Sequence, residues 1–576
     1  MDQHRTHPVH PSQPRTDVRL IFPDGSIYAA PLGTALEDFV TAWQAAATCS
    51  PPVTAVAIGE VIYELSHKPE RDAEVVPLDL GHIDGMRIYK RSLSLVLVAA
   101  AHNLFPESFI SIDHSVTANG FFCEVGGRAP LSTQEVESLD MEMHRLVQAD
   151  MPIVRKRIPL EQAVSTFAAQ GYQDKLRVLR FHHSPELDVY ELDGIVDSFY
   201  GHMVTHTGCL QRFRLHHHES GFTLTFPLSE DPNRFPDETD FPKLMHQFRE
   251  GHRWLATVGA ENVGDLNAAI EDGSIRELIL TAEALHERRI AEIATQIAER
   301  EGVRIVFISG PSSSGKTTFA KRLGIQLGAN GLRSFAVSLD DYFVERELTP
   351  RDEAGQLDFE AFEAIDHALF TQDMSRLLAG ETVTLPRYDF LTGRRVAGPH
   401  IALSPGMVLL VEGLHGLNPN LLHGVPRNAL FKVYVSPLSQ LNIDHHNYVP
   451  TSDGRLVRRI VRDALSRGYT AEQTIERWHS VRRGERRYIF PYQEEADVMF
   501  NSGLAYEMSV LKPLAEPLLL RCDHGSPAAL ESRRLLTLLS FFLPIATELV
   551  PDNSILREFI GGSIFEHLRL VGSSRT

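Results

Sequence analysis

The sequence predicts a multidomain fold with an α+β N-terminal half and an α/β C-terminal half. Short strands and turns alternate from Val18 to Tyr89, which is typical of a small α+β module. After Val303, apolar strands alternate with helices, and this order predicts a parallel sheet with helices on both faces. Residues 310–317 read GPSSSGKT and directly follow the first of these strands, so the C-terminal half is expected to bind phosphate groups.

The N-terminal segment reads as a tail followed by a compact module. Residues 1–17 are rich in His, Pro and Arg, lack the apolar core of a signal peptide and are expected to be disordered. An Asp24-Gly25 turn joins two strand-like segments, and residues 34–47 have helical spacing. We therefore assign residues 18–90 to one small domain.

A long helix is predicted between the two halves. Isoleucines and leucines recur at helical intervals from Gly273 to Arg300, with charges on the opposite face. We assign residues 273–302 to this connecting helix and residues 303–530 to the α/β domain. The leucine-rich stretch that follows predicts a C-terminal helical cap over residues 531–576.

Composition excludes several classes of protein. No apolar run is long enough to span a membrane, so no membrane partner is expected. The four cysteines are far apart and form no CxxC pair, which excludes a disulfide framework or a cysteine zinc site and indicates a cytoplasmic location. The net charge of −19 argues against broad coating of nucleic acid. Anionic ligands must therefore be captured locally.

The glycine-rich turn lies between a strand at 303–308 and a helix at 317–330. This arrangement places backbone N–H groups and the positive end of a helix around one point, where a triphosphate fits. Lys316 is expected to reach the outer phosphates and the Thr317 hydroxyl to hold Mg²⁺, so ATP and Mg²⁺ are predicted ligands. The expected ATP-binding residues of this loop are Gly310, Ser312, Ser313, Ser314, Gly315, Lys316, Thr317 and Thr318.

Two carboxylates follow the next predicted strands. Asp340 comes after the strand at 334–339 and is predicted to be the catalytic base, which takes a proton from an acceptor hydroxyl. Glu412 ends the strand at 407–411 and is suited to orient Mg²⁺. The alternatives are that Asp340 only caps the next segment and that Glu412 is a solvated strand end.

An arginine-rich helix is predicted at residues 455–463. Helical spacing places Arg455, Arg459 and Arg462 on one face, with Arg467 just beyond. Guanidinium groups suit phosphate because they donate paired hydrogen bonds and neutralise charge during transfer. We expect this helix to be a lid over the triphosphate, and an arginine-rich helix without a ligand is the alternative.

With these motifs in one order, residues 305–502 resemble the uridine kinase and phosphoribulokinase family. The resemblance implies that Asp340 is the catalytic aspartate and that Lys316 acts with it. It also implies substrate contacts from Asp358, Tyr388 and Arg459, and donor-phosphate contacts from Arg462 and Arg467. In two places the sequence departs from pyrimidine-specific members: Gly393 lies near the position of a base-reading histidine, and Phe343 replaces a tyrosine. Base selection is therefore left open.

The N-terminal half contains several short motifs in a fixed order. Residues 20–26 (LIFPDGS) and 77–80 (PLDL) resemble the TGS domain of threonyl-tRNA synthetases, a β-grasp fold. Residues 104–106, 119–122 and 132–135 resemble the editing domain of the same family, which we place at 91–272. The metal-ligand positions of that family fall on Arg91, Leu95, Phe199 and Met203, so the metal site is lost. His202, His206 and the run 216–218 leave a relocated site open. We expect a structural, regulatory or recognition role for this half.

The sequence thus predicts a kinase that transfers the γ-phosphate of ATP to a hydroxyl of a small-molecule acceptor, with a nucleoside as first choice. A sugar or sugar-phosphate kinase is one alternative. A nucleotide-gated, RNA-associated sensor without turnover is another. The sequence leaves open whether the N-terminal half contacts RNA and whether the chain forms a homo-oligomer.

Overall fold

The chain divides into two compact units in the computed structural model. The model describes residues 15–46, 52–116, 119–236, 241–352, 355–421, 425–438, 441–566 and 568. The first unit comprises residues up to Ile112, Ala118–Ala169 and Ser184–Asp237, and the second comprises Asp113–Thr117, Gln170–His183 and the chain from Glu238 onward. Most of the tail expected at 1–17 lies outside the described residues, and the first strand begins at Asp17.

A five-stranded sheet begins the first unit, in the order β2-β1-β5-β3-β4. Its strands are β1 (Asp17–Ile21), β2 (Ile27–Pro31), β3 (Ala55–Ile58), β4 (Val61–Tyr63) and β5 (Ala73–Leu78). β1 and β2 form an antiparallel hairpin, whereas β1 and β5 are parallel. Helix α1 (Leu36–Ala46) buries Leu36, Phe39 and Val40 in the same hydrophobic core as Val18 and Leu20 of β1. This is the small α+β module that the sequence predicts.

Two antiparallel sheets follow, in the orders β11-β12-β7-β6 and β10-β9-β8. Their strands are β6 (Phe109–Val116), β7 (Gly120–Gly126), β8 (Val154–Pro159), β9 (Glu186–Leu192), β10 (Ile195–Asp197), β11 (Arg214–His218) and β12 (Gly221–Thr225). The helices of this region are α2 (Ile83–Leu104), α3 (Thr133–Gln148) and α4 (Leu160–Ala169). α3 begins with a capping box in which Ser132 and Glu135 satisfy each other's backbone N–H groups.

A five-stranded parallel sheet in the order β14-β17-β13-β18-β19 forms the core of the second unit. Its strands are β13 (Ile305–Ser309), β14 (Arg333–Ser338), β17 (Met407–Glu412), β18 (Leu430–Ser436) and β19 (Val498–Asn501), close to the predicted bounds. Every residue of β13 is buried, because helices and connecting segments cover both faces of a parallel sheet. An antiparallel hairpin of β15 (Thr382–Asp389) and β16 (Arg394–Ala402) is added to the sheet domain.

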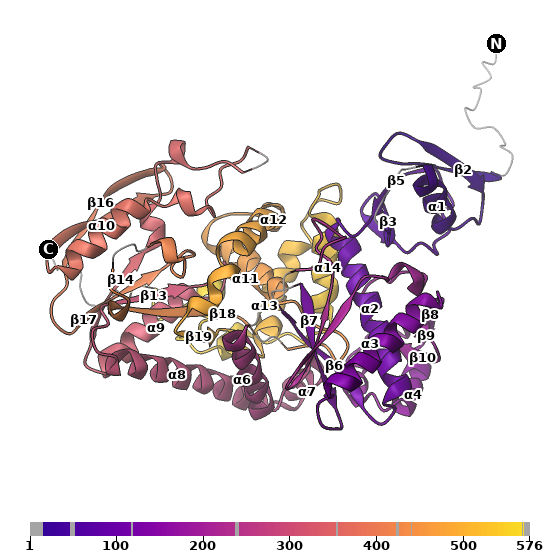
Figure 1. Cartoon of the computed structure of the whole chain (residues 1–576), viewed down its shortest axis with the longest axis horizontal. Coiled ribbons are helices and arrows are strands. Elements are labelled where there is room, and N and C mark those ends of the chain that lie inside the picture. Colours follow the sequence, from indigo (N-terminus) through magenta and orange to yellow (C-terminus); the bar gives the residue numbers. More distant parts are fainter. Residues whose placement is uncertain are drawn as a thin grey trace, which may run out of the picture. The chain divides into compact units, whose positions relative to one another are not determined.

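A single long helix, α8 (Ile275–Glu299), occupies most of the range 273–302 and belongs to the second unit, where it runs beside α9 (Lys316–Ala329) in Figure 1. The other helices of the second unit are α5 (Gln173–Leu179), α6 (Pro242–Val258), α7 (Val263–Asp272), α10 (His367–Leu378), α11 (Thr451–Ser466), α12 (Ala471–Tyr488), α13 (Glu507–Leu519), α14 (Ala529–Ser540) and α15 (Arg557–Ile560). Among the described residues, no helix has the length and apolar character needed to cross a membrane.

The boundary between the units differs from the expected domain bounds. α6 and α7 lie within the range 91–272 that the sequence assigns to an editing-like domain, yet they group with the second unit. The reason is hydrophobic, because Leu244 and Phe248 of α6 share a buried cluster with Leu417 and Tyr434. The predicted C-terminal cap contains α14 and the short α15, and the segment between them includes a 3-10 turn at Thr547–Leu549.

Gly310 generates a prediction about stability. A Cβ at this position would lie 1.9 Å from the carbonyl oxygen of Val435 in β18, so one of two packed strands would have to move. We expect Gly310→Ala to lower the free energy of unfolding by about 1–3 kcal/mol in urea denaturation. The control is Gly328→Ala in α9, where a Cβ meets nothing within 4 Å. That change should be neutral or stabilise by up to about 1 kcal/mol, and equal losses in both variants would contradict the steric argument.

Candidate functional site

Three neighbouring strands end at the same level and bring the predicted site residues together. Both Ile308 of β13 and Ser338 of β14 are register partners of Glu412 in β17. The Ser338 hydroxyl donates to Glu412 Oε1 at 3.3 Å, and Asp340 follows in a short 3-10 turn at Leu339–Tyr342. The glycine-rich loop, Asp340 and Glu412 therefore lie at one edge of the sheet, where open α/β folds bind ligands.

The glycine-rich loop has an unusual backbone and hydroxyls without protein partners. Gly315 and Ser313 both have positive φ, at 85° and 59°. The Oγ atoms of Ser313 and Ser314 are buried and accept or donate no hydrogen bond within the described residues. Lys316 Nζ donates to the carbonyl oxygens of Gly310 and Pro311, both at 2.9 Å. Unsatisfied donors beside a helix start fit the phosphate groups predicted for this loop.

Lys316 lies among four carboxylates. Burial lowers the pKa of Lys316, and the nearby Glu412, Glu558, Asp340 and Glu360 oppose that shift. Burial raises the pKa of Asp340, against the attraction of Lys316. Burial and the neighbouring Asp340 raise the pKa of Glu412 to about 7, and burial raises that of Glu360 to about 7. Four acids around one lysine can supply the carboxylate oxygens that Mg²⁺ prefers, and a bound dication would favour their ionised forms.

Arginines of α11 contact the loop directly. Arg455 donates to the carbonyl oxygen of Ser312 at 3.1 Å, and Arg459 Nη1 donates to Ser312 Oγ at 2.9 Å. Arg455 is buried and paired with Glu485, which also accepts the Ser312 N–H at 3.1 Å. Burial would raise the pKa of Glu485, but Arg455 and a second arginine outweigh it and keep that pKa below its usual value. Arg455 thus holds the glycine-rich loop in position, both directly and through Glu485.

Arg462 and Arg467, the two arginines expected at the donor phosphates, lie at the C-terminal end of α11. Arg462 pairs with Asp463 at 2.8 Å, and Arg467 pairs with the same carboxylate at 3.6 Å. The Arg467 side chain is half exposed, and its charge still acts on Asp340. Both guanidinium groups are thus held through Asp463 at the end of α11.

Comparison with known proteins finds one family that matches the sequence of this region. Residues 305–509 match the phosphoribulokinase/uridine kinase family. The second half of the chain carries a P-loop kinase domain of this family. The uridine kinase of Chloroflexus aurantiacus is 28% identical over 201 residues, which cover 34% of this chain and 87% of that enzyme. A solved structure described as a possible uridine kinase from Bacillus stearothermophilus is 24% identical, covers 37% of this chain and 97% of its own, and has a TM-score of 0.23.

The N-terminal part of the chain is similar to threonine–tRNA ligases. The ligase of Acidithiobacillus ferrooxidans is 28% identical over 162 residues, which cover 28% of this chain and 25% of the ligase. The chain thus spans only about a quarter of that relative's length. The fusion that the sequence predicts, of a ligase-like region to a phosphotransferase domain, is confirmed.

Within the kinase domain, aromatic side chains gather beside Tyr388, for which the sequence predicts a substrate contact. Its ring lies 5.6 Å from that of Phe343 and 5.0 Å from that of Phe390, and its hydroxyl is buried with no hydrogen-bond partner in the described residues. The Tyr388 N–H donates to Asp341 Oδ1 at 3.2 Å. At Gly393, a Cβ would lie 2.8 Å from the Arg346 side chain, so arginine occupies the space beside this position.

Asp358 has a local role in the described structure. Its Oδ1 accepts the N–H of Glu360 at 3.0 Å, and it is Glu360 that acts electrostatically on Lys316. Sequence reasoning missed Glu360, although it follows Asp358 by two residues in the same LDFE segment. It also missed Glu485, which lies 173 residues from the loop that it contacts.

Glu558 of α15 is a further residue that sequence reasoning missed. Its Oε2 accepts the N–H of Thr318 in the first turn of α9 at 3.0 Å, and Ile555 lies against Gly315. Nothing in the local sequence distinguishes Glu558, because only the fold brings the last helix to the glycine-rich loop. A carboxylate therefore holds one of the donors predicted for phosphate.

In the first unit, the positions aligned with the lost editing metal are filled by packing and by an arginine. Leu95, Phe199 and Met203 are buried, and Arg91 Nη1 donates to the carbonyl oxygen of His202 at 2.7 Å. Across the described ranges, one group of three possible metal ligands occurs, and it includes none of His202, His206 or residues 216–218. The relocated site that the sequence left open is not formed there.

Glu360 generates a prediction about pH and stability. Its folded pKa of about 7 exceeds the ordinary 4.5, so ionisation destabilises the fold progressively as the pH rises from 4.5 to 7. We expect Glu360→Gln to be more stable than the parent at pH 8, by at most about 3 kcal/mol, and to lose this advantage toward pH 5. Urea unfolding without nucleotide or dications measures this difference in the free energy of unfolding. The control is Glu363→Gln, because Glu363 is exposed. No difference at pH 8 would contradict the assignment.

Proposed function

We propose that this chain is an ATP- and Mg²⁺-dependent kinase that transfers the γ-phosphate to a hydroxyl of a nucleoside, the 5′-hydroxyl. One observation carries the proposal: the glycine-rich loop, Asp340 and Glu412 end three adjacent parallel strands, with Lys316 facing the carboxylates. The match of residues 305–509 to the phosphoribulokinase/uridine kinase family supports it. The similarity to a uridine kinase favours a nucleoside acceptor.

In this proposal, Asp340 accepts the proton of the attacking hydroxyl. Its raised pKa suits a general base, because a more basic carboxylate holds the proton better as the oxygen attacks. Lys316 exchanges its hydrogen bonds with the loop carbonyls for the outer phosphates. Phosphoryl transfer depends mainly on alignment and charge neutralisation, and both residues supply these at one sheet edge.

Thr317 and Glu412 would hold Mg²⁺, which neutralises charge on the transferred group. Arg462 and Arg467 would donate to the donor phosphates, and Arg459 would reach the acceptor sugar from its place beside Ser312. Gly310, Ser312, Ser313, Ser314, Gly315 and Thr318 would complete the ATP site with backbone N–H groups and hydroxyls. Together, these residues would surround the triphosphate.

The acceptor would bind beside the aromatic side chains of Tyr388, Phe343 and Phe390. A base would pack against this group, and Asp358 would bind the ribose hydroxyls. A pentose phosphate is the second candidate, because Gly393 and Phe343 lack the polar groups that read a pyrimidine. A site without those groups discriminates weakly among acceptors.

The test of the proposal is an acceptor screen. The full chain with ATP and Mg²⁺ is offered nucleosides of each base and, separately, pentose phosphates, and ADP release is measured. We expect nucleosides to stimulate release above the acceptor-free rate. Stimulation by pentose phosphates alone would replace the nucleoside assignment. No turnover with any acceptor, together with tight tRNA binding, would favour an RNA sensor. The similarity to threonine–tRNA ligases is the observation that supports this second candidate.

Asp340→Asn tests the proposed base. We expect kcat to fall by about 10²–10⁴-fold, because the amide cannot accept the proton. ATP affinity measured by calorimetry should change little. The matched control is Asp341→Asn, whose amide oxygen can still accept the Tyr388 N–H and which should keep most of the turnover. Equal activity of Asp340→Asn and the parent chain would exclude Asp340 as the base.

A further inference from the structure

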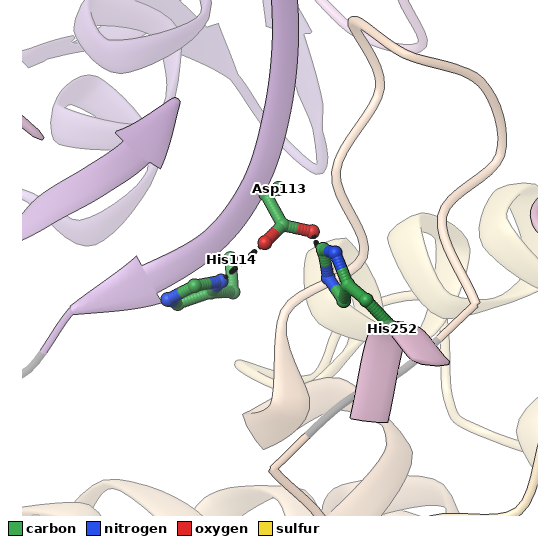
Figure 2. A group of neighbouring side chains, drawn as sticks. All are labelled: Asp113, His114 and His252. Atoms are coloured by element: carbon green, nitrogen blue, oxygen red, sulfur yellow. Dashed lines mark hydrogen bonds and ion pairs between the residues drawn. The ribbon is translucent and has the colours of Figure 1, made fainter. Parts of the chain in front are cut away.

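A second polar cluster lies in the second unit, outside the residues assigned to the kinase cleft. Asp113 and His114 belong to the last part of β6, and His252 lies on α6. Figure 2 shows the Asp113 carboxylate between the two imidazole rings, with one oxygen toward each. Asp113 Oδ2 is 2.7 Å from His114 Nδ1, and Asp113 Oδ1 is 2.5 Å from His252 Nε2. One ligand atom from each residue lies within 4.8 Å of the others.

The composition and burial of the cluster suit a cation. One carboxylate and two imidazole rings converge here, and both kinds of group are metal ligands in proteins. The side chains of Asp113 and His114 are 8% and 5% exposed, so water compensates the charge of the carboxylate poorly.

The three side chains are held in place by their surroundings. The His114 ring stacks on Phe248, with centroids 3.3 Å apart, and Phe248 precedes His252 by one turn on α6. Asn442 Nδ2 donates to the carbonyl oxygen of Asp113 at 2.8 Å. The Tyr448 hydroxyl donates to Ser115 Oγ, also at 2.8 Å. Strand and helix thus present their ligands from fixed positions, which is what a metal site requires.

A small pocket adjoins the cluster. Its volume is about 10 Å³, which is room for about one water molecule, and its lining includes Leu438, Val449 and Thr451 besides the three polar residues. Water can therefore reach a fourth position beside the carboxylate and the imidazoles. Thr451 is the first residue of α11, the helix whose arginines contact the glycine-rich loop.

We propose that Asp113, His114 and His252 bind a transition-metal dication, with Zn²⁺ as the preferred ion and water as the fourth ligand. Two nitrogens and one carboxylate oxygen are a common zinc set, with bonds of about 2.0–2.2 Å. Ca²⁺ and Mg²⁺ prefer all-oxygen sites and are poor candidates. The ion takes the place of the hydrogens now shared between the carboxylate and the rings. A neutral ring then carries its hydrogen on the other ring nitrogen, and a protonated ring releases one proton to solvent. The site would tie the end of β6 to α6, beside the start of α11.

Zinc binding by the full chain tests the proposal. The metal-free protein is loaded with Zn²⁺ in excess Mg²⁺, which occupies oxygen-rich sites, then dialysed, and bound zinc is measured by elemental analysis. We expect one equivalent per chain and a higher melting temperature with zinc. His252→Ala should weaken zinc binding by at least about tenfold. His246→Ala, an exposed histidine on the same helix, should bind like the parent.

A spectroscopic variant covers the case in which His252→Ala is poorly folded. With Co²⁺ as the probe, His252→Cys should gain a thiolate-to-cobalt charge-transfer band that the parent lacks. Absence of that band in a cooperatively folded His252→Cys protein would overturn the proposal. The proposal would also be overturned if the parent chain retained no zinc after dialysis. It would be overturned as well if bound zinc were lost on replacing His4, His7 and His10 but kept in His252→Ala.

Discussion

The level ends of β13, β17 and β14 are the constraint on which the catalytic proposal depends. Because Glu412 is the register partner of both Ile308 and Ser338, the loop after β13 and the turn after β14 must meet at its carboxylate. A shift of one residue in either pairing would turn the side chains of that strand to the other face of the sheet. Parallel pairing thus sets part of the electrostatics, since it places Asp340 and Glu412 beside Lys316.

The buried ion pair beside the glycine-rich loop fixes the conformation of the loop more than it stabilises the fold. Arg455 and Glu485 are almost fully buried, and the cost of removing both from water offsets much of their attraction. Their shared contacts with Ser312 still fix the loop, because the pair satisfies both its carbonyl oxygen and its N–H. Such a network leaves the loop few alternative conformations before any ligand binds.

The sequence predicted the parts of the fold that have strong local patterns. Runs such as 305–308 are apolar at every position, and this identifies buried parallel strands within one or two residues. Asp340 and Glu412 could be found because they directly follow such strands. Glu485, Glu558 and the Asp113–His252 pairing could not, since their partners lie 139 to 240 residues away and no local period marks them. The histidine run at 216–218 gave the stronger local signal, yet it forms no such group in the described structure.

The contact between Glu558 and the Thr318 N–H makes the end of the chain an internal competitor for anions. A phosphate oxygen that takes this N–H must first displace the carboxylate, and Lys321 Nζ, which donates to the Phe565 carbonyl oxygen at 2.7 Å, holds the same segment. The free energy of nucleotide binding would then be the difference between the interaction of the phosphate with this N–H and the interaction of the Glu558 carboxylate that it displaces. By reciprocity, a nucleotide bound there loosens the C-terminal segment by the same free energy with which that segment weakens the nucleotide.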